Sequence, residues 1–273
     1  MASLDRRAIG AAATLLWRNW IAFTRIPALP ADCRPADRAD GYAIQTELAS
    51  LTGQRTVGWK IAATSAAGLA HLDVDGPLAG RLFDGRVVNH GPHGTHEKGF
   101  LTVSLAENAM RLAEAEFAFR LGRGLPRRDR AYELDEVVEA IDTIHPAIEL
   151  PDSRFEDVAK AGAPQLIADD ACASWLVVGA PARMDWRGLD LAAHEVVARR
   201  DGVIAERGTG EKVLGDPRRA LTWLANELRV YGDGLRVDDI VTTGTCITPV
   251  SVAPGDLFSA DFGSLGSIEI KLT

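Results

Sequence analysis

The chain has 273 residues, 47% of them hydrophobic, which is enough to bury a large core in one medium domain or in a domain with an N-terminal extension. Its net charge is -8 and its 30 lysine and arginine residues are scattered, so the composition argues against a nucleic acid partner. Three widely spaced cysteines indicate neither a disulfide framework nor a thiolate zinc site, and we expect a cytoplasmic protein.

The N-terminal fifth of the chain predicts two helices. Apolar residues recur at helical spacing over residues 4–24, a proline-rich stretch then ends the pattern, and a second helix is expected over residues 38–51. The first apolar stretch is interrupted by Arg18 and Asn19 and is followed by no cleavage signal, so we expect neither a membrane-spanning helix nor a signal peptide. Residues 1–54 are therefore expected to form an N-terminal helical region.

From residue 55 onward, short β-branched runs separated by glycines predict a β-rich core over residues 55–273. Strands are expected near residues 56–61, 110–121, 143–150, 173–178, 194–200, 239–244, 256–262 and 267–272. Helices are expected near residues 133–141 and 216–230. The second is the better defined, because Asp216 is a suitable N-cap and Pro217 suits the first turn.

Two glutamates, Glu114 and Glu116, lie inside an otherwise apolar run. On a strand they point to the same face, because strand side chains alternate with period two, and both carboxylates can then hold one cation. On a helix they diverge by roughly 200°, so the pairing has meaning only for a strand. The alternative is a strand with one solvent-exposed face.

Several short segments are each a weak signal alone, but their order along the chain is a strong signal when they are taken together. They are Gly58-Trp59-Lys60-Ile61, Gly80-Arg81-Leu82-Phe83-Asp84, Glu114-Ala115-Glu116, Pro146-Ala147-Ile148-Glu149-Leu150, Val213-Leu214-Gly215-Asp216-Pro217, Thr243-Gly244-Thr245 and Asp261-Phe262-Gly263-Ser264. This order resembles the hydratase and decarboxylase branch of the fumarylacetoacetate hydrolase superfamily, from about residue 41 to the C-terminus. The resemblance implies an α+β fold, with an N-terminal helical part on a mixed β-roll core of the fumarylacetoacetate hydrolase C-terminal-domain type.

The resemblance also implies a divalent metal held by Glu114, Glu116 and Glu149. Three carboxylates suit Mg²⁺ or Mn²⁺, because hard cations prefer oxygen ligands. Such an ion leaves room for the carboxylate and keto oxygens of a 2-oxo acid, whose enolate it stabilises. The alternative for Glu149 is a solvent-facing charge. No histidine is needed, and the cluster between residues 90 and 96 is expected to lie in a surface loop.

Lys60 follows Trp59 in an apolar strand, where a buried ammonium is costly unless it meets an anion. The resemblance implies that Lys60 binds the substrate carboxylate or transfers a proton, and the alternative is a lysine whose stem runs along a sheet edge to water. The resemblance further gives Thr245 a place near the substrate carboxylate, through its hydroxyl or its backbone N–H. The alternative for Thr245 is an ordinary strand end.

The sequence departs from the family pattern at Leu78, where the hydratases carry an aspartate that helps to move protons. Leucine cannot titrate, so Leu78 is expected either to mark a lost acid-base group or to line an apolar substrate-binding subsite. Asp75 and Asp84 are nearby alternatives for the missing acid. A second departure is Asp170, in place of the family's asparagine, which is expected to join the outer shell of the metal or to cap the next element.

These observations predict a metal-dependent hydratase that adds water to a 2-hydroxy-2,4-dienoate or 2-oxo-4-enoate in the catabolism of aromatic compounds. The alternatives are a metal-dependent 2-oxo acid decarboxylase and a non-catalytic partner subunit that keeps the fold. We expect a small 2-oxo or 2-hydroxydienoic acid as partner, no nucleic acid and no membrane. We also expect a homo-oligomer. Trp17, Trp20 and Phe23 would give the first helix more aromatic surface than a helix without a partner usually exposes to water.

Overall fold

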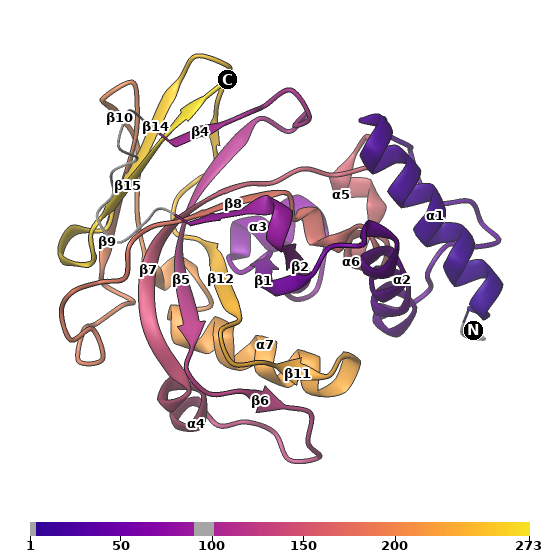
Figure 1. Ribbon diagram of the computed structural model, residues 1–273, viewed down its shortest axis with the longest axis horizontal. Helices are drawn as coiled ribbons and strands as arrows, with labels where there is room; N and C mark the ends of the chain where they lie inside the picture. The colour runs from indigo at the N-terminus through magenta and orange to yellow at the C-terminus, as the bar shows by residue number, and fades with distance from the viewer. Residues whose placement is uncertain (1–3, 90–100) are drawn as a thin grey trace.

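Two curved β-sheets face each other in the computed structural model, and helices cover the ends and one side of the larger sheet (Figure 1). The structure describes residues 4–89 and 101–273. The expected surface histidines at positions 90, 93 and 96 lie outside these described residues.

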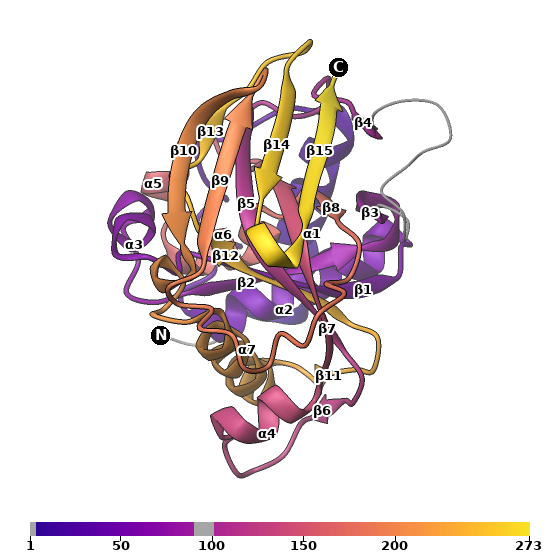
Figure 2. The same ribbon diagram turned by 90° about the vertical axis from the view of Figure 1, so that its left-hand side faces the viewer.

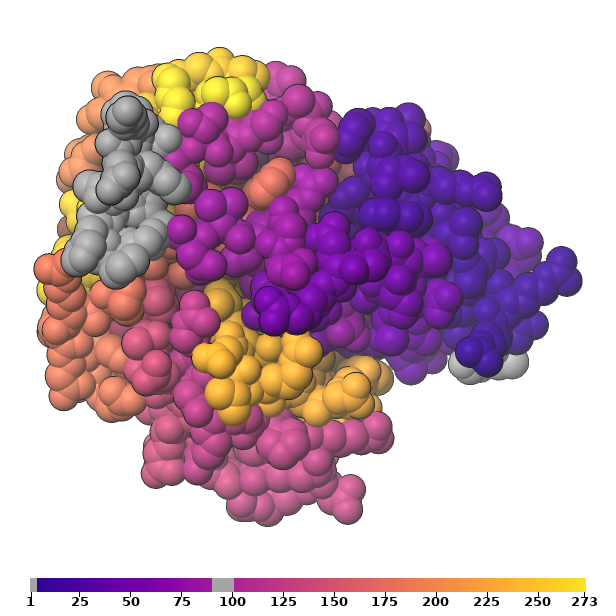
Figure 3. Space-filling model, viewed as in Figure 1, coloured from indigo at the N-terminus to yellow at the C-terminus, as the bar shows by residue number. Residues whose placement is uncertain are grey.

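The N-terminal helices form where the sequence predicts them. Helix α1 spans Arg6–Ala22 and α2 spans Arg38–Thr52, and each begins at an aspartate N-cap, Asp5 and Asp37, whose side chain accepts a backbone N–H. These two helices pack against each other and cover the right-hand end of the molecule (Figure 3). None of the helices within the described residues is both long and apolar enough to cross a membrane.

The aromatic side chains of α1 are mostly covered by the rest of the chain. Trp20 packs edge-on against Phe83 at 6.2 Å between ring centroids, and Trp17 is half-buried against the core. Of the three aromatic residues Trp17, Trp20 and Phe23, only Phe23, which follows the helix and is 53% exposed, is largely open to solvent. Trp17 and Trp20 therefore do not supply the exposed aromatic surface that the sequence suggested.

The larger sheet has eight strands and supplies the residues of the candidate site. Its main order is β2-β1-β12-β5-β7-β8-β3, and β13 pairs with one end of β5. The bounds are β1 Thr56–Ala62, β2 Leu78–Phe83, β3 Val87–Asn89, β5 Leu112–Leu121, β7 Ile141–Leu150, β8 Trp175–Val178, β12 Ile240–Thr245 and β13 Val250–Ser251. The pairs β1–β12 and β3–β8 are parallel, and the other pairs are antiparallel.

The smaller sheet has five strands in the order β10-β9-β14-β15-β4, and it lies in front of the larger sheet in Figure 2. Its strands are β4 Leu101–Val103, β9 Glu195–Arg200, β10 Val203–Thr209, β14 Leu257–Asp261 and β15 Ser267–Leu272. A two-stranded ribbon pairs β6 Leu125–Pro126 with β11 Gly234–Leu235. Buried aromatic rings pack between the larger and the smaller sheet. Phe117 of β5 and Phe262, which directly follows β14, meet edge-to-face with 5.1 Å between ring centroids.

Within residues 4–89 and 101–273 there are five further helices and four 3₁₀ turns. They are α3 Ala66–Leu72, α4 Leu134–Glu139, α5 Val158–Ala161, α6 Ala163–Ala168 and α7 Pro217–Tyr231, with turns η1 Asp84–Arg86, η2 Asp170–Cys172, η3 Gly210–Lys212 and η4 Gly263–Leu265. The expected start of α7 is confirmed, because the Asp216 side chain accepts the N–H of Arg218 and Pro217 opens the helix.

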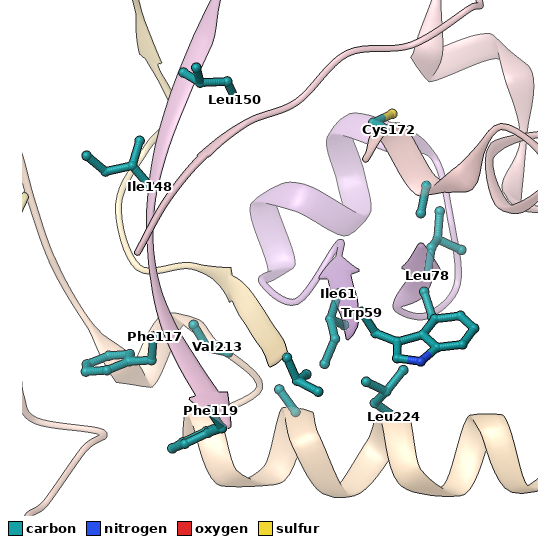
Figure 4. Packing of buried hydrophobic residues seen from close by; sticks show 14 of the residues in the cluster. Trp59, Ile61, Leu78, Phe117, Phe119, Ile148, Leu150, Cys172, Val213 and Leu224 are labelled. Atoms are coloured by element: carbon teal, nitrogen blue, oxygen red, sulfur yellow. The ribbon is translucent and has the colours of Figure 1, made fainter. Parts of the chain in front are cut away.

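Side-chain alternation gives the larger sheet one apolar face and one face with buried charges. On the apolar face, Trp59 and Ile61 of β1 point toward Leu224 of α7, while Phe117 and Phe119 of β5 point away from β1 (Figure 4). Because alternate residues face opposite sides of a strand, the residues between them lie on the other face. That second face carries the candidate site.

Candidate metal-binding site

Three glutamates meet on two neighbouring strands of the larger sheet. Glu114 and Glu116 lie on β5, and Glu149 on β7 is the direct cross-strand partner of Glu114. One carboxylate oxygen from each residue lies within 4.8 Å of the others, because directly opposed residues on one face are neighbours. Across residues 4–89 and 101–273, this is the one group of three or more acidic, histidine or cysteine side chains with such an arrangement.

Lys60 reaches the same cluster from β1. Its Nζ lies 3.0 Å from Glu149 Oε1 and donates a hydrogen bond of 3.2 Å to the carbonyl of Ala171. The side chain is only 3% exposed. Its ammonium is therefore held inside the protein and does not extend along a sheet edge to water.

Glu116 is held in place by the backbone of Gly244. The Gly244 N–H donates to Glu116 Oε2 at 2.8 Å, where the register of β12 shifts between Thr242 and Thr245. Gly244 has a φ of +101°, and a Cβ at this position would lie 2.0 Å from the Oγ1 of Thr64. Glycine is required here for both the backbone conformation and the close approach.

The charges in this cluster do not balance. Three carboxylates and one ammonium leave a net charge of -2 when all are ionised. Burial raises the pKa of Glu114 to about 7, and the charge of Glu149 adds to that effect. Burial, with the charges of Glu149 and Glu114, also raises the pKa of Glu116 well above its ordinary value. A further positive charge at this site would therefore stabilise the ionised form of the three carboxylates.

Lys60 is the one charged partner that the carboxylates have within the described cluster. Burial by itself lowers the pKa of Lys60, but the neighbouring charges of Glu149, Glu114 and Glu116 outweigh it and raise the pKa above its ordinary value. Lys60 is therefore an ammonium at neutral pH.

The donor set fits a divalent cation. Glu116 Oε1 and Glu149 Oε2 are buried and have no hydrogen-bond partner in the described part of the chain. Buried carboxylate oxygens are costly when they are left unpaired. Hard carboxylate oxygens are the ligands that Mg²⁺ and Mn²⁺ prefer, and the net charge of -2 on the whole cluster favours a divalent cation. Glu114, Glu116 and Glu149 are thus the residues that would hold such an ion.

A cavity of about 900 Å³ opens beside the glutamates. Lys60, Glu114, Cys172, Gly244 and Thr245 contribute to its lining. This volume is near the upper end of the range for small-molecule sites, roughly 300 to 1,000 Å³. A substrate in this cavity can reach the charged cluster.

The other residues singled out in the sequence have different positions. Thr245 lines the cavity, and its hydroxyl donates to the carbonyl of Ile247 at 3.1 Å. Leu78 is fully buried in the hydrophobic core near Trp59 (Figure 4) and is not among the residues that line the cavity. Leu78 pairs with Ala62 of β1, so its side chain lies on the same face of the sheet as Lys60, where η2 and α6 pack against β2. That Leu78 contacts substrate stays a prediction.

The alternative acids do not replace the missing family aspartate at the cavity. Asp75 and Asp84 are exposed, and Asp84 Oδ2 lies 3.7 Å from Arg55 Nε. Asp170 is buried, and its Oδ1 accepts the backbone N–H of Arg81 at 2.6 Å. Burial raises the pKa of Asp170 to about 7. Asp170 thus holds the edge strand β2, and it lies outside the group of three glutamates.

Sequence reasoning missed the turn that follows Asp170. Asp170, Ala171 and Cys172 all have positive φ values, 58°, 49° and 62°, which non-glycine residues rarely adopt. This turn aims the Ala171 carbonyl at Lys60 and places Cys172 in the cavity wall. A backbone carbonyl has no side-chain signature, so the sequence offers no signal for this contact.

Sequence reasoning also missed α3, which forms part of the cavity wall. Here a signal was present. Ser65 is a good N-cap, its hydroxyl accepts the N–H of Gly68, and two alanines follow it. The helix has seven residues, which is too short for a clear periodic pattern.

Comparisons with known proteins identify the family of the chain. Residues 90–273 match the family described as fumarylacetoacetate (FAA) hydrolase C-terminal. The chain is 33% identical over 235 residues to 2-keto-4-pentenoate hydratase of Paraburkholderia xenovorans (strain LB400), covering 85% of this chain and 82% of that protein. It is 30% identical over 237 residues to 4-oxalocrotonate decarboxylase of Pseudomonas putida, covering 85% and 84%.

A solved structure matches over the whole length. It is 4-oxalocrotonate decarboxylase from Pseudomonas putida G7, complexed with magnesium and adipate, with a TM-score of 0.87, 27% identity and full coverage of both chains. The α+β fold class expected from the sequence is confirmed by this neighbour.

Proposed function

Because the chain belongs to the FAA hydrolase C-terminal family, we propose that it is a metal-dependent hydratase, a lyase that adds water to a 2-hydroxy-2,4-dienoate or 2-oxo-4-enoate. The observation that carries the proposal is the meeting of Glu114, Glu116 and Glu149 beside Lys60 at the wall of one cavity. The similarity to a hydratase over 85% of the chain supports the same reaction.

The three glutamates are the proposed ligands of Mg²⁺ or Mn²⁺. Such an ion, when bound, polarises the keto group of a 2-oxo acid and stabilises the negative charge that develops on its oxygen. The magnesium in the structurally similar decarboxylase supports a divalent ion. The Gly244 N–H contributes by fixing one oxygen of Glu116, so that the carboxylate is oriented before the ion arrives.

Lys60 is the proposed catalytic residue. Its ammonium is charged at neutral pH, because its pKa is raised, so it suits the donation of a proton or the binding of a substrate carboxylate. The Ala171 carbonyl and Glu149 fix the position of its Nζ. Thr245 lines the cavity and is the proposed contact for the substrate carboxylate through its backbone or hydroxyl.

The decisive experiment is an ultraviolet assay of the loss of 2-hydroxypenta-2,4-dienoate, with and without Mg²⁺. We expect turnover only when the divalent ion is present. A metal-loaded protein that binds 2-oxo acids but turns over neither this dienoate nor 4-oxalocrotonate would instead support a non-catalytic partner subunit.

Decarboxylation of a 2-oxo acid is the second candidate function. It is favoured by the TM-score of 0.87 to 4-oxalocrotonate decarboxylase and by the buried leucine, Leu78, where the hydratases carry an acid. Decarboxylation also proceeds through an enolate but needs less proton transfer than hydration. Release of CO₂ from 4-oxalocrotonate, measured in parallel with the dienoate assay, separates the two reactions.

We further propose a cytoplasmic homo-oligomer, with residues 1–54 as a helical region and residues 55–273 as the catalytic core. Free, buried Cys33, Cys172 and Cys246 support a reducing compartment. The exposed Phe23, together with Val203 at 71% exposure on β10, supports association of copies. Sedimentation at micromolar concentration tests the oligomer, and a monomer would refute it.

A further inference from the structure

The cavity is large for the short substrate of a pentenoate hydratase. A five-carbon acid has eight non-hydrogen atoms, whereas a cavity of about 900 Å³ is near the upper limit for drug-sized ligands. An acid anchored at Lys60 and the glutamates would leave most of this space to water.

The wall away from the glutamates is apolar. Leu112 lies on β5 two residues before Glu114, so it is on the same face and roughly 7 Å further along the strand. Ile247 follows Thr245 after the end of β12 and adds a second apolar side chain. The cavity lining thus changes from a charged side chain at Glu114 to an apolar one at Leu112, two residues away on the same face of β5.

Helix α3 forms another wall, mostly with apolar side chains. Leu69 and Leu72 are half-buried, and both line the cavity. No residue of α3 is fully buried, so this helix does not bury its leucines in the core in the way that α7 does. Leucine side chains that line an open cavity lose contact with water when an apolar ligand group enters.

The charged side chains at the rim do not provide a net charge for a second acidic group. Glu211 and Lys212 are adjacent, exposed and opposite in sign, and both contribute to the lining. Lys60 is paired with Glu149 at the other end of the cavity. The exposed His71 of α3 also lines the cavity. A second substrate carboxylate would therefore meet leucines, this one histidine and the offsetting charges of Glu211 and Lys212, with no buried cation besides Lys60 among the described lining residues.

From these walls we propose that the preferred substrate is a 2-oxo or 2-hydroxydienoic acid with an uncharged apolar group, alkyl or aryl, at the end remote from its carboxylate. The inference rests on the proposed function, because it places the acid end of the substrate at Lys60 and the three glutamates. Leu69, Leu72 and Leu112 are the residues that determine this specificity.

The test uses unreactive saturated 2-oxo acids, titrated calorimetrically into the full-length protein in saturating Mg²⁺. Affinity should rise about 4-fold for each methylene from 2-oxopentanoate through 2-oxohexanoate to 2-oxooctanoate, or about 60-fold in all. 2-Oxoadipate, with a second carboxylate at the far end, should bind more weakly than 2-oxohexanoate. Equal affinities along the series, or tighter binding of 2-oxoadipate, would overturn the inference while leaving the proposed function intact.

Two variants locate the effect. Leu69→Ala should weaken binding of 2-oxooctanoate by a factor on the order of ten and leave 2-oxopentanoate unchanged, because only the longer acid reaches α3. Leu51→Ala removes a partly exposed helical leucine outside the cavity and should change neither affinity. If both variants behave alike, α3 does not contact the ligand and the inference fails. If no 2-oxo acid binds in Mg²⁺, the proposed function itself fails.

Discussion

Lys60 Nζ lies 3.0 Å from Glu149 Oε1, although two strands, β12 and β5, lie between the strands that carry these residues. In a flat sheet, strands three places apart are about 14 Å from each other. The contact forms because the sheet is curled and both long side chains rise from its concave face. The curl thereby gathers charges from three strands into one buried cluster.

The metal site predicts the effect of losing one carboxylate charge. Glu116→Gln keeps the size of the side chain but removes a negative charge and one hard ligand, so Mg²⁺ affinity should fall at least 10-fold. Calorimetric titration with Mg²⁺ measures this change. The matched control is Glu47→Gln on the exposed side of α2, which should bind Mg²⁺ like the unmodified protein. Equal affinity in all three proteins would remove Glu116 from the site.

The raised pKa of Glu114, about 7, predicts a pH dependence. Without metal, the folded state binds a proton at Glu114 more tightly than the unfolded state does, so this contribution to stability is present below about pH 4.5 and is lost as the pH rises through 7. A divalent ion must displace that proton, so the ion binds better above pH 7. The increase in Tm caused by Mg²⁺ should therefore be larger at pH 8 than at pH 5.5. A pH-independent increase would contradict this assignment.

Replacing Lys60 separates catalysis from metal binding. Lys60→Met removes the only ammonium that the structure describes in the cluster, so the metal-free protein should lose about 3 to 5 kcal/mol of stability at pH 8. Mg²⁺ should restore part of this loss and bind with undiminished affinity. Turnover should nevertheless fall by roughly 10² to 10⁴ if Lys60 transfers a proton. The exposed Lys160→Met serves as the control, and full turnover in Lys60→Met would refute the catalytic assignment.

Two glycines provide a matched pair for the backbone at the site. Gly244→Ala should cost more than about 1 kcal/mol, because a positive φ and a contact of 2.0 Å with Thr64 oppose a Cβ, and it should weaken Mg²⁺ binding through Glu116. Gly10→Ala in α1 has no atom within 4 Å of the new Cβ and should stabilise the protein by about 0.5 to 1 kcal/mol. Chemical denaturation measures both. A tolerated Gly244→Ala would show that the β12 turn is not constrained.

The burial of Leu78 predicts a purely structural effect. Leu78→Ala should cost about 2 to 5 kcal/mol of unfolding free energy, because it leaves a cavity in a packed core. The ratio of kcat/KM for short and long substrates should stay unchanged, since Leu78 does not line the substrate cavity. A changed ratio in the folded variant would return Leu78 to the substrate-binding residues.

Local sequence pattern was sufficient to predict some of the structural features of this protein. Period-two alternation put Glu114 and Glu116 on one face of a strand, and cap chemistry at Asp216 placed the start of α7 correctly. These features depend on neighbours in the chain, so they are visible in the sequence. The order of motifs then indicated the family to which the chain belongs.

Only the tertiary structure decided how Lys60 and Glu149 meet, since their contact depends on strand order and on the curl of the sheet. It also decided how Leu78 is packed. The pairing of β2 with β1 puts Leu78 on the same face as Lys60, and only the tertiary structure shows that its side chain is buried there and is not among the residues lining the cavity. The Ala171 carbonyl that fixes Lys60 comes from a turn 111 residues away in sequence, where positive φ angles are maintained by tertiary contacts and not by local preference.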